Sequence, residues 1–234
     1  MLPRLGSCAL ALAMVAGTAA CELPRDPDNT LRRVAGGVMR VGATEAPPWV
    51  VAGEDGTEGV DIDLVLGFAA SLNARVARHH GSEEQLLEAV EAGELDLVVG
   101  GLSTETPWVG RVQLTRPYAV TRILVAVPVG VPVPPDLDGV RVAAEAGTRV
   151  PRLVRDAGGI PLRVRDLARA SGPVAGDEWQ IRDLGLVPTH LVLAEERHVM
   201  AINLGENGFG HRLDRYLHGV AEQVRVMLER AAPA

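Results

Sequence analysis

The 234-residue sequence contains no lysine, so all 23 of its basic residues are arginine. This absence excludes lysine Schiff-base chemistry. Only two cysteines are present, too few for a disulfide framework or a cysteine-rich zinc site. A net charge of -7 argues against a broad nucleic-acid surface, because binding to phosphates requires a basic face. We therefore expect no nucleic-acid partner.

Aromatic residues are also scarce, at 3%, whereas 47% of the residues are hydrophobic and 23% are charged. This balance is typical of packed globular domains. No glycine-rich phosphate loop, nucleophile elbow or metalloprotease helix motif occurs in the sequence. His198, beside Glu195 and Glu196, is the one cluster of mixed metal-ligand types, and we expect a hydrogen-bonded structural role for it. The sequence thus predicts no catalytic residue, no cofactor and no metal site.

The first twenty residues have the pattern of a secretory signal, with one charge at Arg4, an uncharged apolar stretch and small residues at its end. The quartet Thr18-Ala19-Ala20-Cys21 resembles the bacterial lipobox, in which the cysteine becomes the first residue and carries acyl chains. We expect a lipoprotein signal peptide over 1–20, lipidation of Cys21, and a tether and lead-in over 21–37. An ordinary signal with an incidental cysteine is the alternative.

Strand and helix patterns alternate through the rest of the chain, which is typical of an α/β fold with parallel strands. Before the middle of the chain the patterns predict a strand over 38–43, helices over 61–72 and from the capping box at 82–85 to Gly93, and a strand over 95–99. Later patterns predict strands over 140–144, 162–164, 191–195 and 199–202, a helix from Gly147 through Val154, and a long helix over 212–230.

A proline-rich segment over 125–135 predicts an extended crossing between two α/β lobes. We expect lobe 1 over 38–126, lobe 2 with the hinge over 127–197, and a return to lobe 1 with a C-terminal helix over 198–234.

Five motifs occur in an order that resembles one family. They are Val41-Gly42-Ala43-Thr44 with Pro47-Pro48-Trp49, then 58–64, 92–103, Thr115-Arg116-Pro117-Tyr118, and 138–148. In this order they resemble the bacterial extracellular solute-binding proteins of family 3, the polar amino acid receptors of ABC importers. The resemblance implies a two-lobed, periplasmic-binding-protein-like (type II) clamp with hinge crossovers, which closes on a ligand between the lobes.

The resemblance also implies which lobe 1 residues bind the ligand. Trp49 would lie over the ligand, and the loop 101–103 would bind its amino and carboxylate groups. Trp108 stands where the family has an arginine that grips the carboxylate, so an ordinary α-amino acid would lose its bidentate partner. Arg111 could replace that arginine only if the loop is reshaped, and a solvated arginine is the alternative.

In the second lobe, the segment 147–149 could offer free N–H groups to an anion, or Thr148 could be only a helix cap. Asp177 falls roughly where the family has an aspartate that pairs with the ligand amine. Glu178 is its nearest competitor, and a plain surface loop without a ligand role is the other alternative. Trp49 and Trp108, with or without Trp179, could form an aromatic box for a cationic or flat ligand opposite Asp177. Alternatively, Trp108 and Trp179 could pack against their own lobes. The expected ligand-binding residues are Trp49, Gly101, Leu102, Ser103, Trp108, Thr148, Arg149 and Asp177.

These observations favour a monomeric, non-catalytic receptor. It would be anchored through lipid on Cys21, in the periplasm or on the outer side of the cytoplasmic membrane. It would deliver a small polar, amino-acid-like or cationic organic ligand to an ABC permease. Three alternatives remain: a sensory or regulatory module acting on a partner in trans, a dehydratase that uses carboxylates in the cleft, and a receptor without a ligand.

Overall fold

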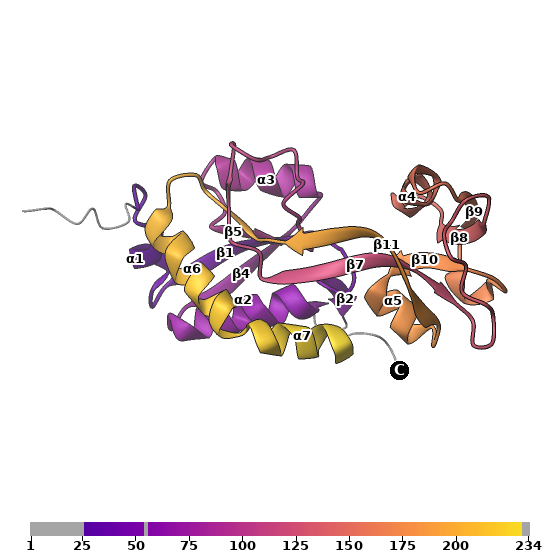
Figure 1. Cartoon of the computed structure of the whole chain (residues 1–234). Coiled ribbons are helices and arrows are strands. Elements are labelled where there is room, and N and C mark those ends of the chain that lie inside the picture. Colours follow the sequence, from indigo (N-terminus) through magenta and orange to yellow (C-terminus); the bar gives the residue numbers. More distant parts are fainter. Residues whose placement is uncertain (1–25, 54–55, 231–234) are drawn as a thin grey trace, which may run out of the picture.

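Two five-stranded sheets organise the chain, which is described by a computed structural model over residues 26–53 and 56–230. The expected signal peptide and Cys21 lie outside the described residues. We call each sheet with the helices that cover it lobe one and lobe two (Figure 1). The lobes lie at opposite ends of an elongated molecule and are joined by two long strands (Figure 1).

The sheet of lobe one has the order β4 (Arg75–His80), β1 (Val38–Ala43), β5 (Leu97–Val99), β12 (Ala201–Ile202) and β6 (Gln113–Leu114). Strand β1 is parallel to β4 and β5, while β12 is antiparallel to β5 and β6. A hairpin of β2 (Val51–Gly53) and β3 (Gly56–Glu58) accompanies the sheet. The helices of lobe one are α1 (Thr30–Val34), α2 (Val60–Ser71), α3 (Glu83–Glu91), α6 (Asn207–Gly219) and α7 (Ala221–Arg230).

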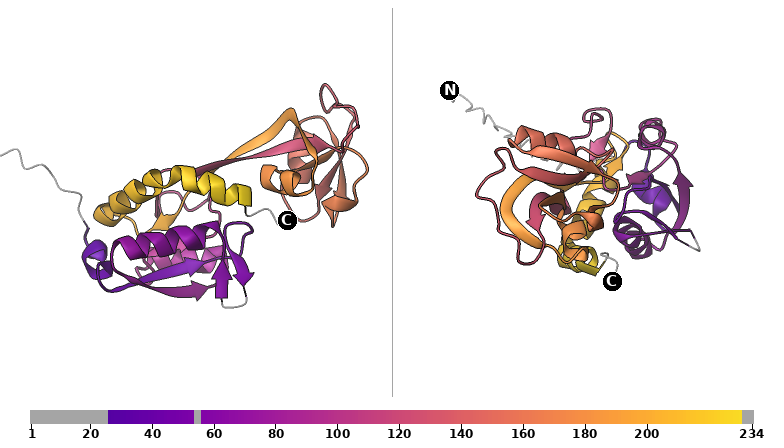
Figure 2. Two further views of the ribbon diagram at one scale, coloured as in Figure 1. Left: turned by 90° about the horizontal axis from the view of Figure 1, so that it is seen from below. Right: turned by 90° about the vertical axis from the view of Figure 1, so that its right-hand side faces the viewer.

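Lobe one is a three-layered unit because its central strand buries both faces. In β5, Leu97 and Val99 pack with residues of α2, α6 and α7, whereas Val98 packs with residues of α3. This alternation follows from the two-residue period of a strand. Helix α3 begins at the predicted capping box, in which Ser82 and Gln85 bond to each other's backbone N–H, and this prediction is confirmed. Figure 2 shows α6 and α7 running alongside α2 on one side of the lobe.

The sheet of lobe two has the order β11 (Val187–His198), β7 (Ala119–Val127), β10 (Val174–Asp177), β8 (Arg141–Glu145) and β9 (Ile160–Val164). Its helices are α4 (Val150–Asp156), α5 (Glu178–Asp183) and the short 3-10 helix η1 (Leu167–Arg169). Strands β8, β9 and β10 run parallel, and β7 is antiparallel to both β10 and β11. Along β7, Ile123 and Val125 face the α4 side, and Leu124 and Ala126 face the α5 side. Lobe two therefore has three layers as well.

The two connections between the lobes are β7 and β11, which pair side by side. Their antiparallel register runs from Val187 opposite Val127 to His198 opposite Ala119. The extended crossing therefore begins at Ala119, earlier than the proline-rich segment at 125–135. The predicted α/β class with hinge crossovers is confirmed.

Two predicted helix boundaries are wrong. The long C-terminal helix is divided into α6 and α7, which separate at Val220, and it begins at Asn207 rather than at Arg212. The helix expected from Gly147 begins at Val150. Gly147 has a φ of +88°, a left-handed conformation that lies outside the helical region and that glycine adopts readily, so residues 147–149 form a turn.

Residues 26–29, the described part of the expected tether, are docked on lobe one. The Asp26 carboxylate accepts hydrogen bonds from the backbone N–H of Leu31 at 2.7 Å and of Phe209 at 3.1 Å. The Glu206 carboxylate accepts from the N–H of Asp28 and of Thr30, at 2.7 and 3.1 Å. These bonds attach the lead-in and α1 to the start of α6.

A buried carboxylate joins α1, β1 and the start of β5 in lobe one. Asp96 is 2% exposed and accepts hydrogen bonds from the guanidinium groups of Arg33 and Arg40, each with one contact of 2.6 Å. The N–H of Arg40 also donates to it at 2.8 Å. Burial opposes ionisation of Asp96, but the bonds from the two arginines outweigh burial and lower its pKa below 3.8.

Asp96→Asn should therefore destabilise the protein at neutral pH. Because these are hydrogen bonds to a charged group, we expect a loss of about 1.5–3 kcal/mol in the free energy of unfolding. Because the pKa of Asp96 is lower in the folded protein than the unfolded value of 3.8, its ionised form stabilises the fold at pH values above 3.8. This stabilisation is lost as the pH falls through the pKa of the folded protein. Urea denaturation at neutral pH and near pH 3 would measure both effects. Asp156→Asn, at an exposed position, is the control, and an equal loss in that variant would contradict the assignment.

Candidate functional site

The loop after β5 forms the lobe-one side of the site. Gly100 and Gly101 have φ values of +136° and +66°, which favour glycine. Their N–H groups donate to the same carboxylate oxygen of Asp61, at 2.9 and 3.0 Å. A side chain at position 101 would collide with the indole of Trp49. The loop is therefore held from one side by Asp61 and covered on the other by Trp49.

Asp61, in the first turn of α2, is buried and carries a second bond. Its other oxygen accepts the hydroxyl of Tyr118 at 2.5 Å. Burial raises the pKa of Asp61 to about 6, although the bonds from Gly101, Tyr118 and Gly100 favour the ionised form. Burial and the Asp61 charge also raise the pKa of Tyr118 well above 10, so the phenol stays protonated and remains the donor.

His198, the last residue of β11, connects this loop to both hinge strands. Burial lowers its pKa to about 4, so the imidazole is neutral at physiological pH. Its Nδ1 lies 3.2 Å from the carbonyl of Gly101, which can only accept, so Nδ1 carries the proton. Its Nε2 then accepts the hydroxyl of Thr121 in β7, at 2.8 Å. The predicted hydrogen-bonded structural role of His198 is confirmed.

Trp49 completes an aromatic cluster at the root of the hinge. Its ring lies 4.0 Å from that of His198, centroid to centroid, and meets the ring of Tyr118 edge-on at 5.9 Å. Trp49 is only 5% exposed, so this conformation leaves little of its ring open to a ligand.

Arg149 reaches from lobe two to lobe one and to the hinge. It lies in the turn before α4, and its guanidinium donates to Glu105, in the loop that follows β5, at 3.3 Å. A second nitrogen of the same group donates to Glu196 on β11. The Glu196 carboxylate also lies 3.7 Å from Nε2 of His198. Arg149 is thus already engaged with two carboxylates.

Asp177, at the end of β10, lies near this group. Its backbone N–H donates to the side-chain oxygen of Gln180 at 3.3 Å, at the start of α5. Burial and the nearby charge of Glu196 raise the pKa of Asp177 to about 6, and Arg149 only partly offsets them. The carboxylates of Asp177, Glu145 and Glu196 thus lie near the guanidinium of Arg149.

The remaining candidates on the two loops have local roles. The Thr148 hydroxyl donates to the carbonyl of Glu145 at 2.9 Å and accepts the N–H of Val150 at 3.3 Å, so it is used within its own turn. Leu102 is buried in lobe one beside α3, and Ser103 forms an isolated bridge with His198. Glu178 accepts from Arg122 at 2.9 Å, at the surface of β7.

The structure does not bring the three tryptophans together. Trp108 is 7% exposed and packs in lobe one beneath α3, away from the cluster that contains Trp49. The Arg111 guanidinium stacks on Trp108 at 4.0 Å and donates to Glu91 at 2.5 Å, which holds it on the surface of lobe one. Trp179, on α5, lines a separate cavity of lobe two.

Sequence reasoning missed the roles of Tyr118 and Asp61, although both lie in the quoted motifs. A signal was present: an aspartate between Val60 and Ile62 is a polar residue in an apolar segment, and such a residue needs a buried partner. No comparable local signal pointed to the ion pairs of Arg149.

The described residues contain no group of three or more His, Cys, Asp or Glu side chains placed to hold a metal ion. Among these same residues, no helix combines the length and the apolar character that crossing a membrane requires.

Comparisons with known proteins agree with this architecture. The family described as "Bacterial extracellular solute-binding proteins, family 3" matches residues 39–222. An ancestral cationic amino acid solute-binding protein superposes with a TM-score of 0.72 and 18% identity, covering 88% of this chain and 99% of that one. The L-cystine solute receptor of Neisseria gonorrhoeae, in its unliganded open conformation, gives 0.69 and 17%, with 83% and 92% covered. At such low identity these structures show the fold alone.

A curated relative is longer. Membrane-bound lytic murein transglycosylase F of Vibrio cholerae is 31% identical over 85 residues, which are 36% of this chain and 16% of the relative. The match thus spans about a sixth of the relative's length.

We expect Tyr118→Phe to destabilise the fold more at high pH than at low pH. The pKa of Asp61 is 3.8 in the unfolded chain and about 6 in the folded protein. The contribution of Asp61 to the free energy of unfolding therefore decreases as the pH rises from 3.8 through about 6. Without the phenol the folded pKa rises further, so the extra loss appears above pH 6. The expected cost is about 1 kcal/mol near pH 5, where the carboxyl is neutral, and about 1.5–3 kcal/mol near pH 8.

Thermal or urea unfolding at both pH values would measure this difference. Tyr216→Phe is the matched control, because within the described part of the chain the Tyr216 hydroxyl has no hydrogen-bond partner and lies against Gly67. A loss of stability in Tyr118→Phe that does not change with pH would contradict the role of Asp61.

Proposed function

Because the chain belongs to the bacterial extracellular solute-binding proteins of family 3, we propose that it is a receptor that binds without catalysis. It captures a small polar, amino-acid-like or cationic organic ligand between its lobes and delivers it to an ABC importer. The observation that carries this proposal is a group of three carboxylates, those of Asp177, Glu145 and Glu196, around the single guanidinium of Arg149. Arg149 also reaches Glu105, in the same lobe-one loop as Gly101, which Trp49 covers.

A cationic group is the part of the ligand that this region suits best. Asp177 is desolvated and lies near Glu196 and Glu145, so a proton is held on it more tightly than in water. An ammonium or guanidinium group would relieve this repulsion and form charge-assisted hydrogen bonds. The ligand carboxylate has weaker support, since Trp108 replaces the expected arginine and Arg149 is committed to Glu105 and Glu196.

Closure would follow from contacts to both lobes. The β7–β11 pair joins the lobes and ends at His198, beside the loop that lies against Trp49. A ligand that is held through its cationic group by Asp177 in lobe two and that also contacts lobe one would stabilise the closed form more than the open form. This is the hinge-bending mode of two-lobed receptors.

The location follows from the same proposal. The family is extracellular by its description. We propose that lipid on Cys21 anchors the protein to the membrane, in the periplasm or on the outer side of the cytoplasmic membrane, and that the receptor is a monomer, with a permease as its partner.

A second candidate is a regulatory module that acts on a partner in trans. The observation that favours it is the Vibrio cholerae match, in which a related segment forms part of a much longer membrane-bound enzyme. In this reading the ligand would control the partner and would not be transported. A cation that binds but is not taken up by a reconstituted importer would favour regulation over transport.

A thermal melting screen tests the proposed function. Amino acids, polyamines and quaternary amines would be added to the purified protein, and tryptophan fluorescence would be recorded in parallel. A ligand at 100 times its Kd should raise the free energy of unfolding by about 2.7 kcal/mol. If every compound in the set leaves both melting and fluorescence unchanged, the proposed ligand binding is wrong, and the alternative of a protein that binds no ligand is favoured.

The affinity for such a cation should depend on pH through Asp177. With a pKa of about 6, Asp177 ionises between pH 5 and 7, so binding should tighten about tenfold over that interval and then level off. Asp177→Asn should weaken binding at pH 7.5 and remove most of this dependence. Titration calorimetry would measure both.

Glu178→Gln is the control for this experiment, because Glu178 is paired with Arg122. It should leave the pH profile unchanged. Asp61 also has a pKa of about 6, so the pH dependence of the affinity alone does not distinguish Asp61 from Asp177. The Asp177→Asn variant makes this distinction. An unaltered profile in Asp177→Asn would exclude Asp177 as the ligand's partner.

A further inference from the structure

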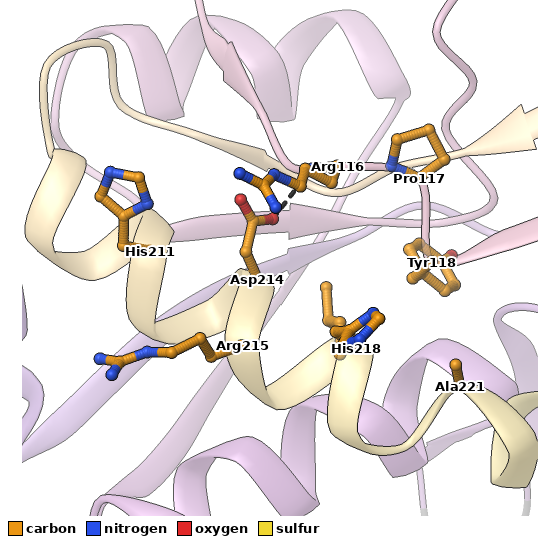
Figure 3. A pocket seen from close by; sticks show the side chains of 9 residues that line it. Arg116, Pro117, Tyr118, His211, Asp214, Arg215, His218 and Ala221 are labelled. Carbon is orange, nitrogen blue, oxygen red and sulfur yellow. Dashed lines mark hydrogen bonds between the residues drawn. The ribbon is translucent and has the colours of Figure 1, made fainter.

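A cavity of about 660 Å³ lies on lobe one, between the segment Arg116–Tyr118 and the α6–α7 region (Figure 3). Its lining includes neither the Gly101 loop nor any residue of lobe two, so it is separate from the interlobe region. The volume lies in the range of small-molecule sites. No part of the proposed receptor function uses this cavity.

One face of α6 forms a wall of the cavity. His211, Asp214, Arg215 and His218 recur at spacings of three and four residues, which places them on the same side of the helix. The carboxylate of Asp214 accepts the N–H of Arg116 at 2.8 Å and so ties the helix to the facing segment. The wall is therefore built by sequence-distant segments that are fixed to each other.

The charge in this cavity is opposite to that of the whole chain. The lining contains the guanidinium groups of Arg116 and Arg215, the imidazoles of His211 and His218, and one carboxylate, that of Asp214. The whole chain, by contrast, carries a net charge of -7. Figure 3 shows Arg116, His211 and Asp214 toward one end and Pro117, Tyr118 and Ala221 toward the other. The charged residues Arg116, Asp214 and Arg215 thus gather toward one end, and apolar residues with His218 lie toward the other.

We propose that this cavity binds a small organic anion with an apolar body. Its carboxylate would lie against Arg116, which can form charge-assisted hydrogen bonds with it, and Arg215 would add a second positive charge to the lining. Its apolar body would cover Tyr118, Leu217 and Ala221. Concave shape, an apolar floor and a few convergent charges together define this class of site.

An occupant would also touch the root of the hinge. Tyr118 lines the cavity, donates its hydroxyl to Asp61 and meets the Trp49 ring edge-on, and β7 begins at the next residue. Binding in the cavity therefore changes the surroundings of Trp49 through Tyr118. Trp49 fluorescence reports this effect whether or not the interlobe region holds a ligand.

Titration calorimetry with 3-phenylpropionate tests the proposal, and 3-phenylpropylamine serves as a cation of similar shape. We expect the anion to bind at least about tenfold more tightly than the amine, with a change in tryptophan fluorescence. The double variant Arg116→Gln/Arg215→Gln removes two exposed charges and should weaken anion binding by a similar factor. Arg75→Gln/Arg141→Gln removes the same charge at exposed positions outside the cavity and should bind as the parent does.

Ala221→Trp provides a second test, because a large side chain at this exposed position would fill the apolar end without removing a charge. It should abolish binding of 3-phenylpropionate while melting stays normal. Asp177→Asn should leave the affinity for 3-phenylpropionate unchanged, because Asp177 does not line the cavity. The anion site can therefore be confirmed even if the proposed receptor function is wrong. Equal affinity for the amine, no anion binding, or an equal loss in the Arg75/Arg141 control would overturn the proposal.

Discussion

The arrangement of lobe one depends on the buried carboxylate of Asp61. One of its oxygens holds the Gly100 and Gly101 N–H groups, and the other holds the Tyr118 hydroxyl. A buried carboxylate without such partners would be costly, so the helix, the loop and the start of β7 must keep their relative positions. Trp49 and His198 then pack against the loop that Asp61 fixes. Through these contacts a single charge in α2 positions the end of each hinge strand.

Much of the fold could be predicted from the sequence, because the periodicity of apolar residues and the capping of helices depend only on residues that are close together in the chain. The strand at 38–43, the capping box at Ser82 and the alternating strands and helices needed only neighbouring residues. The break at Val220 follows Gly219, the last residue of α6 and a poor helix former, but the apolar spacing continues across it and therefore predicted one helix. The predicted strand at 191–195 is shorter than β11 because its partner, β7, lies sixty or more residues earlier in the chain.

The candidate site could be predicted only in part. Its loops followed from the resemblance, but the ion pairs of Arg149 join residues about fifty positions apart, and no spacing rule connects them. The burial of Trp108 likewise depends on α3, which is distant in the sequence, as well as on nearby Val112. The two candidate sites differ in charge. Carboxylates outnumber cations around Arg149 between the lobes, and cations outnumber carboxylates in the cavity beside α6. The two regions therefore favour ligands of opposite charge.

The pairing of β7 with β11 limits how the lobes can move. Hydrogen bonds between two antiparallel strands resist sliding of one strand along the other, because every bond in the ladder would break at once. Bending and twisting of the ribbon cost much less. The ladder is regular from Ala194 to His198 and shifts register twice between Pro188 and Ala194. The register shifts lie where β7 also pairs with β10, inside the sheet of lobe two, so the regular segment next to Trp49 is the part of the ribbon that connects the lobes and bends when they close.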